Sequence, residues 1–533
     1  MSPLSEPSPT SQPVLVAGRW RPADVVETYQ SVNPATGESL PDAWPVSGWS
    51  DVEEALDAAT AAAGVLAATP GEQIAGFLER YARRLEGRGD DLVAAAHAAT
   101  GLATTPRLAD IELPRTLDQL RQAAAAARSG DWRLAVIDSS RNIRSAAFPL
   151  GPVVVLPPSN FPLAFGCLTG GDFAAAFAAG CPVIAKAHPG HPAVSQLAAG
   201  EAVAALGESG LPAASIQLIH GLGIEDGERL VADARVGATA FTGGERAGRR
   251  LFAAASATGR PIWVEMGSLN PVVLLPAAIA SRAASIADEL TTSVTGSAGQ
   301  LCTKPGLVFL VDDEAGRGFV EAVAERFRSV APQLLLGPPV RERLDASLAT
   351  LERAGARRIA GAEAAAEGCR HAATLLETTA SEFIGRGELL SEAFGNATLL
   401  VRCDSLDELA QAIERLPGTL AASLYSDAGD EQAVGSIAAR LAAISGRLIE
   451  NRMPTGLAVS PAMHHGGPWP AAGPPFFSAV GLPFSMLRFA RRICYDGCSP
   501  LRLPDCLADA VPPGSPWRMI DGTWTRQPVG SGA

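Results

Sequence analysis

Residues 151–187 decide the fold class, and they read GPVVVLPPSNFPLAFGCLTGGDFAAAFAAGCPVIAKA. An apolar run rich in valine, Pro152–Leu156, is followed by an alanine-rich helical stretch over about 168–180 and by a second apolar run, Pro182–Ala187. A strand, a helix and a second strand in this order form a crossover unit, in which the two strands are parallel. This stretch therefore predicts a parallel sheet that is covered by helices.

The same alternation continues on the C-terminal side. Further strands are expected at Ser215–His220, Ala238–Thr242, Trp263–Glu265 and Pro271–Leu275, with helices at about 193–208, 225–233 and 245–257. A second alternating block follows over about 268–480, and helices precede the first block. We expect an α/β fold with two sheet domains. Parallel sheets bind ligands beyond the carboxyl ends of their strands, so residues there are candidates for chemistry.

Composition excludes several classes of protein. The chain of 533 residues is 47% hydrophobic, which rules out a largely disordered protein. Its net charge of −13 argues against binding of nucleic acid. The uncharged run over residues 145–171 contains five prolines, so we expect no membrane span there. The N-terminal residues have neither a basic nor an apolar segment, which predicts no signal peptide and a cytoplasmic protein.

Two candidate catalytic side chains lie in glycine-containing segments. Cys302 follows a run of small residues that leaves room for a substrate, and Lys304 places a positive charge nearby that favours the thiolate. Glu265 ends an apolar strand, where burial raises the pKa of a carboxyl group toward the range of a general base. Taken singly, a buried structural cysteine and a glutamate that caps a turn are the simpler readings.

Other candidates follow strand ends. Asn160 lies just past a strand and is placed to donate to an oxyanion, and Lys186 ends a strand, a position that suits a ribose or phosphate group. The segment Phe241–Gly248 joins a strand to a helix through glycines, and such a helix start binds pyrophosphate. His188 with His191, and His464 with His465, lack a third ligand, so no metal site is expected.

The order of these motifs resembles the aldehyde dehydrogenase superfamily. They are Ser-Asn-Phe-Pro at 159–162, the strand that ends in Lys186, Phe-Thr-Gly-Gly at 241–244, Glu-Met-Gly at 265–267, Gly-Gln-Leu-Cys at 299–302 and Glu-Ala-Phe-Gly at 392–395. A narrower resemblance, to the NADP-type branch with α-ketoglutaric semialdehyde (2,5-dioxopentanoate) dehydrogenases, rests on residues 186–192, 302–306, 454–456, 465–468 and 488–495.

The resemblance implies a role for each candidate. Cys302 would attack the aldehyde, Asn160 would stabilise the oxyanion, and Glu265 would activate water to hydrolyse the thioester. Residues implied to hold the cofactor are Lys186, His188, Thr242, Gly243, Gly248, Glu392 and Phe394. Pro189 occupies the position where NAD-preferring relatives carry an acidic residue, so a 2′-phosphate is not repelled and NADP is favoured, with NAD use open.

The resemblance also implies the domain organisation. We expect a Rossmann-like cofactor-binding domain, a catalytic α/β domain and a small bridging element through which a homodimer or homotetramer forms. The expected boundaries are a disordered tail over 1–13, a cofactor-binding domain over 14–132 and 150–267, a catalytic domain over 268–483, a bridging element over 133–149 and 484–505, and a C-terminal tail over 506–533.

Three alternatives to an α-ketoglutaric semialdehyde dehydrogenase remain open at this point. A dehydrogenase of fatty or other aliphatic aldehydes would share the mechanism. An acylating enzyme that transfers the thioester to coenzyme A is disfavoured by Glu265, because that residue activates water. A non-catalytic homologue that serves as a binding protein is disfavoured by the presence of Cys302, Glu265, Lys186 and Asn160 together.

Overall fold

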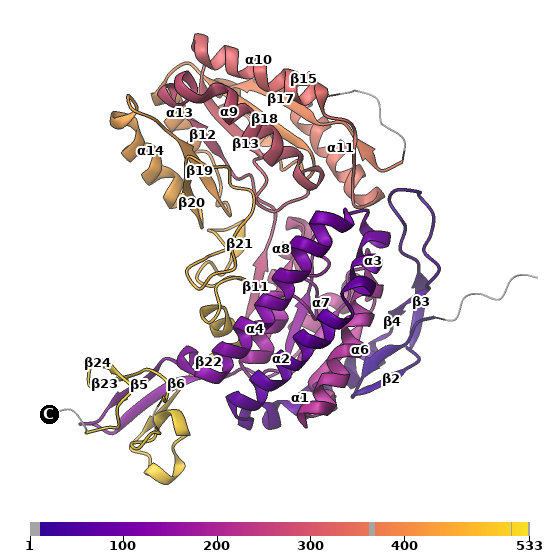
Figure 1. The fold of residues 1–533 in the computed structure, drawn as a ribbon, viewed down its shortest axis with the longest axis vertical. Helices are drawn as coiled ribbons and strands as arrows, with labels where there is room; N and C mark the ends of the chain where they lie inside the picture. The colour runs from indigo at the N-terminus through magenta and orange to yellow at the C-terminus, as the bar shows by residue number, and fades with distance from the viewer. Residues whose placement is uncertain (1–10, 362–367, 513, 531–533) are drawn as a thin grey trace, which may run out of the picture.

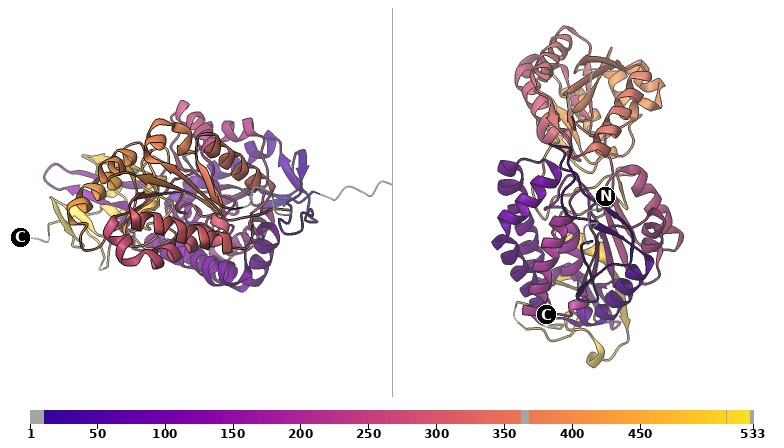
Figure 2. Two further views of the ribbon diagram at one scale, coloured as in Figure 1. Left: turned by 90° about the horizontal axis from the view of Figure 1, so that it is seen from above. Right: turned by 90° about the vertical axis from the view of Figure 1, so that its right-hand side faces the viewer.

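A computed structural model describes residues 11–361, 368–512 and 514–530 of the chain. Two α/β domains lie one above the other, and an arm made of strands projects from the lower domain (Figures 1 and 2). The expected tail over residues 1–13 lies mostly outside the described residues.

The lower domain contains the sheet that residues 151–187 predict. Its strands are ordered β2-β1-β9-β8-β7-β10-β11-β21. The central five are parallel and confirm the expected strands to within a residue or two: β7 (Val153–Leu156), β8 (Val183–Lys186), β9 (Ile216–Ile219), β10 (Ala238–Thr242) and β11 (Ile262–Glu265). Their carboxyl ends therefore lie along one edge of the sheet.

Both margins of this sheet are antiparallel. On one side β1 (Val14–Val16) pairs with β9 and with β2 (Arg19–Arg21). On the other side β21 (Ala472–Gly473) pairs with β11, so a segment expected in the catalytic domain joins the lower sheet. A separate hairpin consists of β3 (Val25–Tyr29) and β4 (Trp44–Ser47).

Helices cover both faces of the lower sheet, because alternate side chains of each buried strand point to opposite faces. Val153 and Val155 belong to the core with one group of helices, whereas Val154 packs with α1 (Trp49–Ala68) on the other face. The first group is α2 (Gly71–Gly87), α3 (Gly89–Thr100), α4 (Leu113–Ser129), α5 (Gly171–Ala178) and α6 (Pro192–Ser209). The opposite face also carries α7 (Ile224–Ala232) and α8 (Glu245–Ala257).

The upper domain has its own sheet, ordered β15-β17-β18-β13-β12-β19-β20. Its strands are β12 (Val272–Leu274), β13 (Leu307–Val311), β15 (Arg357–Ala360), β17 (Thr374–Thr379), β18 (Ala397–Cys403), β19 (Ala422–Tyr425) and β20 (Leu448–Glu450). All neighbours are parallel except β15 and β17. A short pair, β14 (Gln333–Leu334) and β16 (Arg370–His371), lies beside it.

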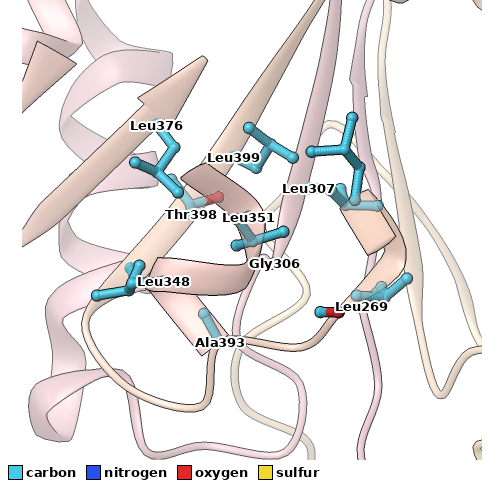
Figure 3. Close-up of a pocket in the computed structure, with 12 residues that line it drawn as sticks. Leu269, Gly306, Leu307, Leu348, Leu351, Leu376, Ala393, Thr398 and Leu399 are labelled. Atoms are coloured by element: carbon cyan, nitrogen blue, oxygen red, sulfur yellow. The ribbon is translucent and has the colours of Figure 1, made fainter. Parts of the chain in front are cut away.

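Helices also cover the upper sheet. They are α9 (Pro276–Thr295), α10 (Glu314–Ser329), α11 (Pro338–Arg353), α12 (Ala380–Gly385), α13 (Leu406–Ile413) and α14 (Glu431–Ile444). A small hollow in this domain is lined mostly by leucines, among them Leu269, Leu307, Leu348 and Leu399 (Figure 3). No titratable side chain lines this hollow, so it offers mostly apolar contact and no acid or base.

The arm is a five-stranded sheet, ordered β22-β6-β5-β23-β24. Three strands fall inside the expected bridging segments: β5 (Ala135–Asp138), β6 (Ile143–Pro149) and β22 (Ala490–Asp496). The other two, β23 (Arg518–Ile520) and β24 (Thr523–Thr525), come from residues 506–533, which were expected to be a tail. These strands of three residues are too short for an alternating pattern to reveal them.

Two helix starts differ from what their sequence spacing suggests. Ser50 and Glu53, and Thr69 and Glu72, are spaced as capping boxes. However, α1 begins at Trp49 with Gly48 as its cap, and α2 begins after Pro70. The Ser50 hydroxyl instead donates to Asp24, and the Thr69 hydroxyl donates to the carbonyl of Val65. Contacts with neighbouring residues outcompete the local cap at both positions.

Among the described residues, no helix is long and apolar enough to span a membrane.

Candidate active site

The loop that carries Cys302 is held in a strained conformation between two other loops. Three residues before it, Ser297, Ala298 and Gly299, have φ angles of 50°, 53° and 68°. A Cβ on Gly299 would collide with the carbonyl oxygen of Gly395, so only glycine permits this approach. The Cys302 loop is therefore fixed directly against the loop at 392–395.

Cys302 faces a histidine. Its Sγ lies 3.0 Å from Nε2 of His465. Burial raises the pKa of the Cys302 thiol to about 12, and the charge of Glu265 acts in the same direction. Burial, together with the charges of Arg115 and Arg447, lowers the pKa of His465 to about 3. The resting pair is therefore a neutral thiol beside a neutral imidazole that has a lone pair for a proton.

Glu265 ends β11 and is only 7% exposed. Its Oε1 accepts a hydrogen bond from the backbone N–H of Ala479 at 2.8 Å, whereas its buried Oε2 has no partner among the described residues. Burial raises the pKa of Glu265 to about 8, the nearby Asp172 adds to this rise, and Arg488 opposes it. The expectation of a carboxyl group with a raised pKa at this strand end agrees with this geometry.

Asp172 and Arg488 form a buried ion pair next to Glu265. Nη1 of Arg488 lies 2.7 Å from Oδ1 of Asp172. The arginine side chain is 2% exposed and the aspartate side chain is 10% exposed. Because the pair is close to neutral as a unit, it adjusts the local potential at Glu265 without placing a net charge there.

Asn160 lies beside the Cys302 loop. Its side-chain Nδ2 donates to the carbonyl of Gln300 at 2.9 Å, two residues before Cys302. Its own carbonyl accepts from Nη2 of Arg107 at 2.9 Å, and Arg107 is ion-paired with the buried Glu112. Glu112 in turn accepts from the backbone N–H groups of residues 163 and 164. Asn160 therefore sits on a well-anchored loop with its amide aimed at the Cys302 segment.

Lys186 and Thr242 lie at the carboxyl edge of the lower sheet, as expected. Thr242 is paired with Glu265 in register, and Lys186 with Ile219. Burial lowers the pKa of Lys186 to about 8, and its ammonium has no ion-pair partner among the described residues. A half-buried ammonium with no ion-pair partner is suited to a polar ligand at the sheet edge.

His188 lies just beyond Lys186. Its ring stacks on that of His191 at 5.1 Å, and its Nδ1 accepts from the N–H of Gly190 at 3.0 Å. Burial holds the pKa of His188 well below its usual range, and the charges of Lys186 and Arg343 act in the same direction. His188 is therefore neutral in this structure and carries no positive charge of its own toward a phosphate.

The glycine segment after β10 packs against the strand that ends in Glu265. The N–H of Gly243 donates to the carbonyl of Glu265 at 3.0 Å. A Cβ on Gly248 would lie 2.5 Å from the sulfur of Met266, so a larger residue here would force the Met266 side chain to move. Gly244 caps α8 without a side-chain hydrogen bond, which leaves the first N–H groups of this helix available to an anion.

Glu392 reaches the same region from the upper domain. A Cβ on Gly267 would collide with its Oε2, and the N–H of Ser268 donates to its carboxylate. Burial raises the pKa of Glu392, and the charge of Lys304 opposes this rise. Phe394 follows on the same loop and is half-buried. The structure thus brings Glu392 to within contact of the segment after Glu265.

The expected influence of Lys304 on the thiol is not found. Lys304 is 2% exposed, and its ammonium donates to the carbonyls of Ala393 and Ala397 at 2.9 and 2.7 Å. Its charge is not among the largest influences on the pKa of Cys302, whereas those of Arg115 and Arg447 are. Lys304 therefore fixes the loop at 392–397, and this backbone role could not be read from its closeness to Cys302 in sequence.

Sequence reasoning missed three neighbours of the catalytic candidates. His465 was noted only as part of a motif, and Arg115 and Ala479 carried no signal of their own. The one available signal was the pair His464–His465 beside glycines, which was weighed as a metal site. Among the described residues, no group of three His, Cys, Asp or Glu side chains is placed to hold a metal ion.

Comparisons with known proteins identify the family. The sequence model of the aldehyde dehydrogenase family matches residues 20–467. The chain is 38% identical over 530 residues to alpha-ketoglutaric semialdehyde dehydrogenase 2 of Azospirillum brasilense, covering 95% of this chain and 98% of that protein. It is 33% identical over 512 residues to alpha-ketoglutaric semialdehyde dehydrogenase of Acinetobacter baylyi, covering 94% and 96%.

A solved structure shows the same fold. A mutant of aldehyde dehydrogenase C from Pseudomonas syringae, in complex with NAD⁺ and octanal, superposes with a TM-score of 0.79 at 21% identity, over 93% of this chain and 98% of the other. The resemblance on which the sequence analysis relied is thereby confirmed. This chain belongs to the aldehyde dehydrogenase family and has its α/β fold.

Proposed function

We propose that this protein oxidises α-ketoglutaric semialdehyde (2,5-dioxopentanoate) to a carboxylate through a thioester on Cys302, with NADP as the hydride acceptor. The observation that carries the proposal is the position of Cys302, whose sulfur lies 3.0 Å from a neutral histidine nitrogen. A nucleophile within hydrogen-bond reach of a base is the arrangement that covalent catalysis requires.

The first step is attack of the Cys302 sulfur on the aldehyde carbon. As the carbon–sulfur bond forms, the thiol proton passes to Nε2 of His465, which is the basic atom in contact with the sulfur. The carbonyl oxygen becomes an alkoxide, and the amide of Asn160 donates to it in exchange for its present bond to Gln300. Loss of hydride from this adduct then leaves a thioester on Cys302.

The residues at the sheet edge fit a dinucleotide cofactor, which supplies the hydride acceptor when it is bound. The half-buried ammonium of Lys186 has no ion-pair partner among the described residues, and the N–H groups at the start of α8 lack a side-chain cap. We propose that Lys186 and Glu392 hold ribose hydroxyls, that Thr242, Gly243 and Gly248 belong to the pyrophosphate loop, and that His188 and Phe394 lie along the cofactor.

The second step is hydrolysis of the thioester. The carboxylate of Glu265 removes a proton from water, the resulting hydroxide adds to the thioester carbon, and the carbon–sulfur bond breaks. The proton held on Nε2 of His465 then returns to the Cys302 sulfur, which restores the thiol, and Glu265 releases the proton taken from water to the solvent. A pKa of about 8 makes Glu265 a stronger base than an exposed carboxylate while leaving an ionised fraction near neutral pH.

The proposed preference for NADP rests on the residue at position 189. Pro189 follows the strand-end Lys186 where a carboxylate would repel the 2′-phosphate. His188 is neutral, so the positive charges near the phosphate come from Lys186 and Arg343. The solved neighbour from Pseudomonas syringae holds NAD⁺, and the experiment therefore compares both nucleotides.

The substrate assignment rests on the two relatives whose printed names include α-ketoglutaric semialdehyde. A dehydrogenase of aliphatic aldehydes is the second candidate, because the solved neighbour is in complex with octanal. We further propose that the arm of β5, β6 and β22 forms a homodimer or homotetramer interface, since β22 and β24 are the edge strands of its sheet.

The test is formation of reduced nucleotide by the purified protein. We would supply NADP or NAD with 2,5-dioxopentanoate, pentanal or octanal, and use Cys302→Ala as the control. The proposal predicts the fastest turnover with 2,5-dioxopentanoate and NADP, and none in the variant. Turnover only with pentanal and octanal would show that the substrates are aliphatic aldehydes. Unchanged turnover in Cys302→Ala would contradict the mechanism.

A further inference from the structure

Arg115 is a cation close to the candidate nucleophile whose guanidinium is not fully bonded by the protein. Its Nε and Nη2 atoms are buried and have no hydrogen-bond partner among the described residues. Buried polar atoms are nearly always hydrogen-bonded in native proteins, and a buried charge needs a counter-charge or hydrogen bonds. Two orphaned donors on one guanidinium therefore call for a functional explanation.

The position of Arg115 follows from a chain of contacts. Its Cζ lies 5.0 Å from the centre of the Phe165 ring. Phe165 meets the ring of His465 edge-on at 6.0 Å, and His465 contacts the Cys302 sulfur at 3.0 Å. The charge of Arg115 also acts on Cys302 and on Glu265. The guanidinium thus lies in the same cluster as the nucleophile, next to Phe165 and His465.

Two other arginines lie in this region, and the protein itself uses the donors of both. Arg107 packs on Phe161 at 4.3 Å, but it is ion-paired with Glu112 and donates to the Asn160 carbonyl and the Ser297 hydroxyl. Arg447, whose charge acts on Cys302, donates to the carbonyls of residues 454 and 456. Arg115 differs from these two arginines. It lies close to Cys302, and no described residue accepts a hydrogen bond from its Nε or Nη2.

We propose that Arg115 binds the carboxylate of the substrate, so that the site selects aldehydes that carry an acidic group at the far end of the chain. The inference rests on the proposed function and names the recognition element within the same site. A guanidinium presents parallel N–H donors that match a carboxylate, which gives orientation as well as charge. Phe161 and Phe165 offer apolar contact to the carbon chain between the two ends.

The kinetic test compares Arg115→Met with Arg121→Met. Arg121 lies on the same helix α4, is exposed, and pairs only with Glu86 at the surface among the described residues, so it is a matched loss of one positive charge. We expect Arg115→Met to raise the KM for 2,5-dioxopentanoate about 10- to 100-fold. The KM for pentanal, which has the same chain length and no carboxylate, should stay within about twofold.

The control variant Arg121→Met should leave both KM values unchanged. Equal losses for the two aldehydes in Arg115→Met would show a structural role and overturn the inference. If the ratio of kcat/KM for 2,5-dioxopentanoate to kcat/KM for pentanal is the same in Arg115→Met as in the wild type, the inference is overturned as well.

A binding measurement separates this inference from the proposed function. Calorimetric titration of the Cys302→Ala protein with 2-oxoglutarate, the product of the proposed reaction, requires no turnover. We expect binding that is lost when Arg115→Met is added and kept when Arg121→Met is added. If the wild-type protein oxidises none of the aldehydes but this Arg115-dependent binding is seen, the proposed function fails and the inference about Arg115 stands. Absence of binding, or binding that does not depend on Arg115, would contradict the inference.

Discussion

Cys302 and His465 lie 163 positions apart in the chain, yet the sulfur of one is 3.0 Å from Nε2 of the other. The contact joins the loop after α9 to the segment that precedes β21. The backbone N–H of His465 donates to the hydroxyl of Ser478 at 2.9 Å, which fixes the main chain at this position. The neutral imidazole therefore lies directly against a thiol whose pKa burial raises to about 12.

Replacement of His465 by alanine tests this relationship. We expect kcat to fall at least about 100-fold, because removal of a positioned base typically costs about 10²–10⁴ in rate. Alkylation of Cys302 by iodoacetamide should slow in parallel, as fewer thiolates form at neutral pH. The neighbouring His464→Ala is the matched control and should behave as the wild type. If the two variants react alike, His465 is not the proton acceptor.

Replacement of Glu265 by glutamine should separate the two chemical steps. The variant is expected to form about one equivalent of reduced nucleotide per site and then stop, because the thioester is no longer hydrolysed. Rapid-mixing absorbance measures this burst. Glu245→Gln, an exposed position at the start of α8, is the control. Steady turnover in Glu265→Gln at the wild-type rate would assign the water-activating role to another group.

The pH dependence of the hydrolysis step should follow the ionisation of Glu265. Its pKa is raised to about 8, and only the ionised form accepts a proton from water. The rate of thioester hydrolysis is therefore low below the pKa, rises as the pH passes through about 8, and levels off above it. A pH series of the steady-state rate measures this limb. A rate that falls as the pH rises over the same range would contradict the role of Glu265 as the base.

The ion pair between Asp172 and Arg488 should affect both stability and this pH limb. Asp172→Asn leaves Arg488 buried without a counter-charge, which is expected to cost about 3–5 kcal/mol of the free energy of unfolding. Loss of the negative charge also lowers the pKa of Glu265, so the limb moves to lower pH. Denaturant unfolding and the pH profile measure the two effects. Glu86→Gln, in an exposed pair with Arg121, should change neither.

Most of the fold could be predicted from the sequence, because its strands are apolar runs separated by clear helical segments. The central strands β7 to β11 carry valine, isoleucine and alanine with no charge until the last residue, where Lys186 and Glu265 mark two ends. Their parallel order then brings candidates far apart in sequence to one edge. The short strands β21, β23 and β24 lack such a pattern, since two or three residues carry no periodicity.

The site was predicted less completely, for a physical reason. Motifs with glycine or a strand end identify residues whose own segment positions them, such as Asn160 and Cys302. His465 and Arg115 contact residues that are distant in sequence, and the residues that flank them give no pattern from which those contacts could be predicted. Lys304 shows the converse, because its nearness to Cys302 in sequence suggested an electrostatic role, whereas its ammonium is bound by backbone carbonyls.

The proposed preference for NADP can be tested at one position. Pro189→Glu introduces a carboxylate near the expected 2′-phosphate. Like-charge repulsion should weaken NADP binding about tenfold or more, with a smaller effect on NAD. Titration of each nucleotide against the protein measures both dissociation constants. Equal changes for the two nucleotides would show that residue 189 does not face the phosphate.

The most direct test of the central claim is to find the acyl group on the protein. The Glu265→Gln protein would be exposed to 2,5-dioxopentanoate and NADP, and its intact mass and peptides measured. We expect one acyl group per chain, attached to the peptide that contains Cys302. Reduced nucleotide formed without an adduct, or an adduct on another cysteine, would contradict the claim that this protein oxidises its aldehyde through Cys302.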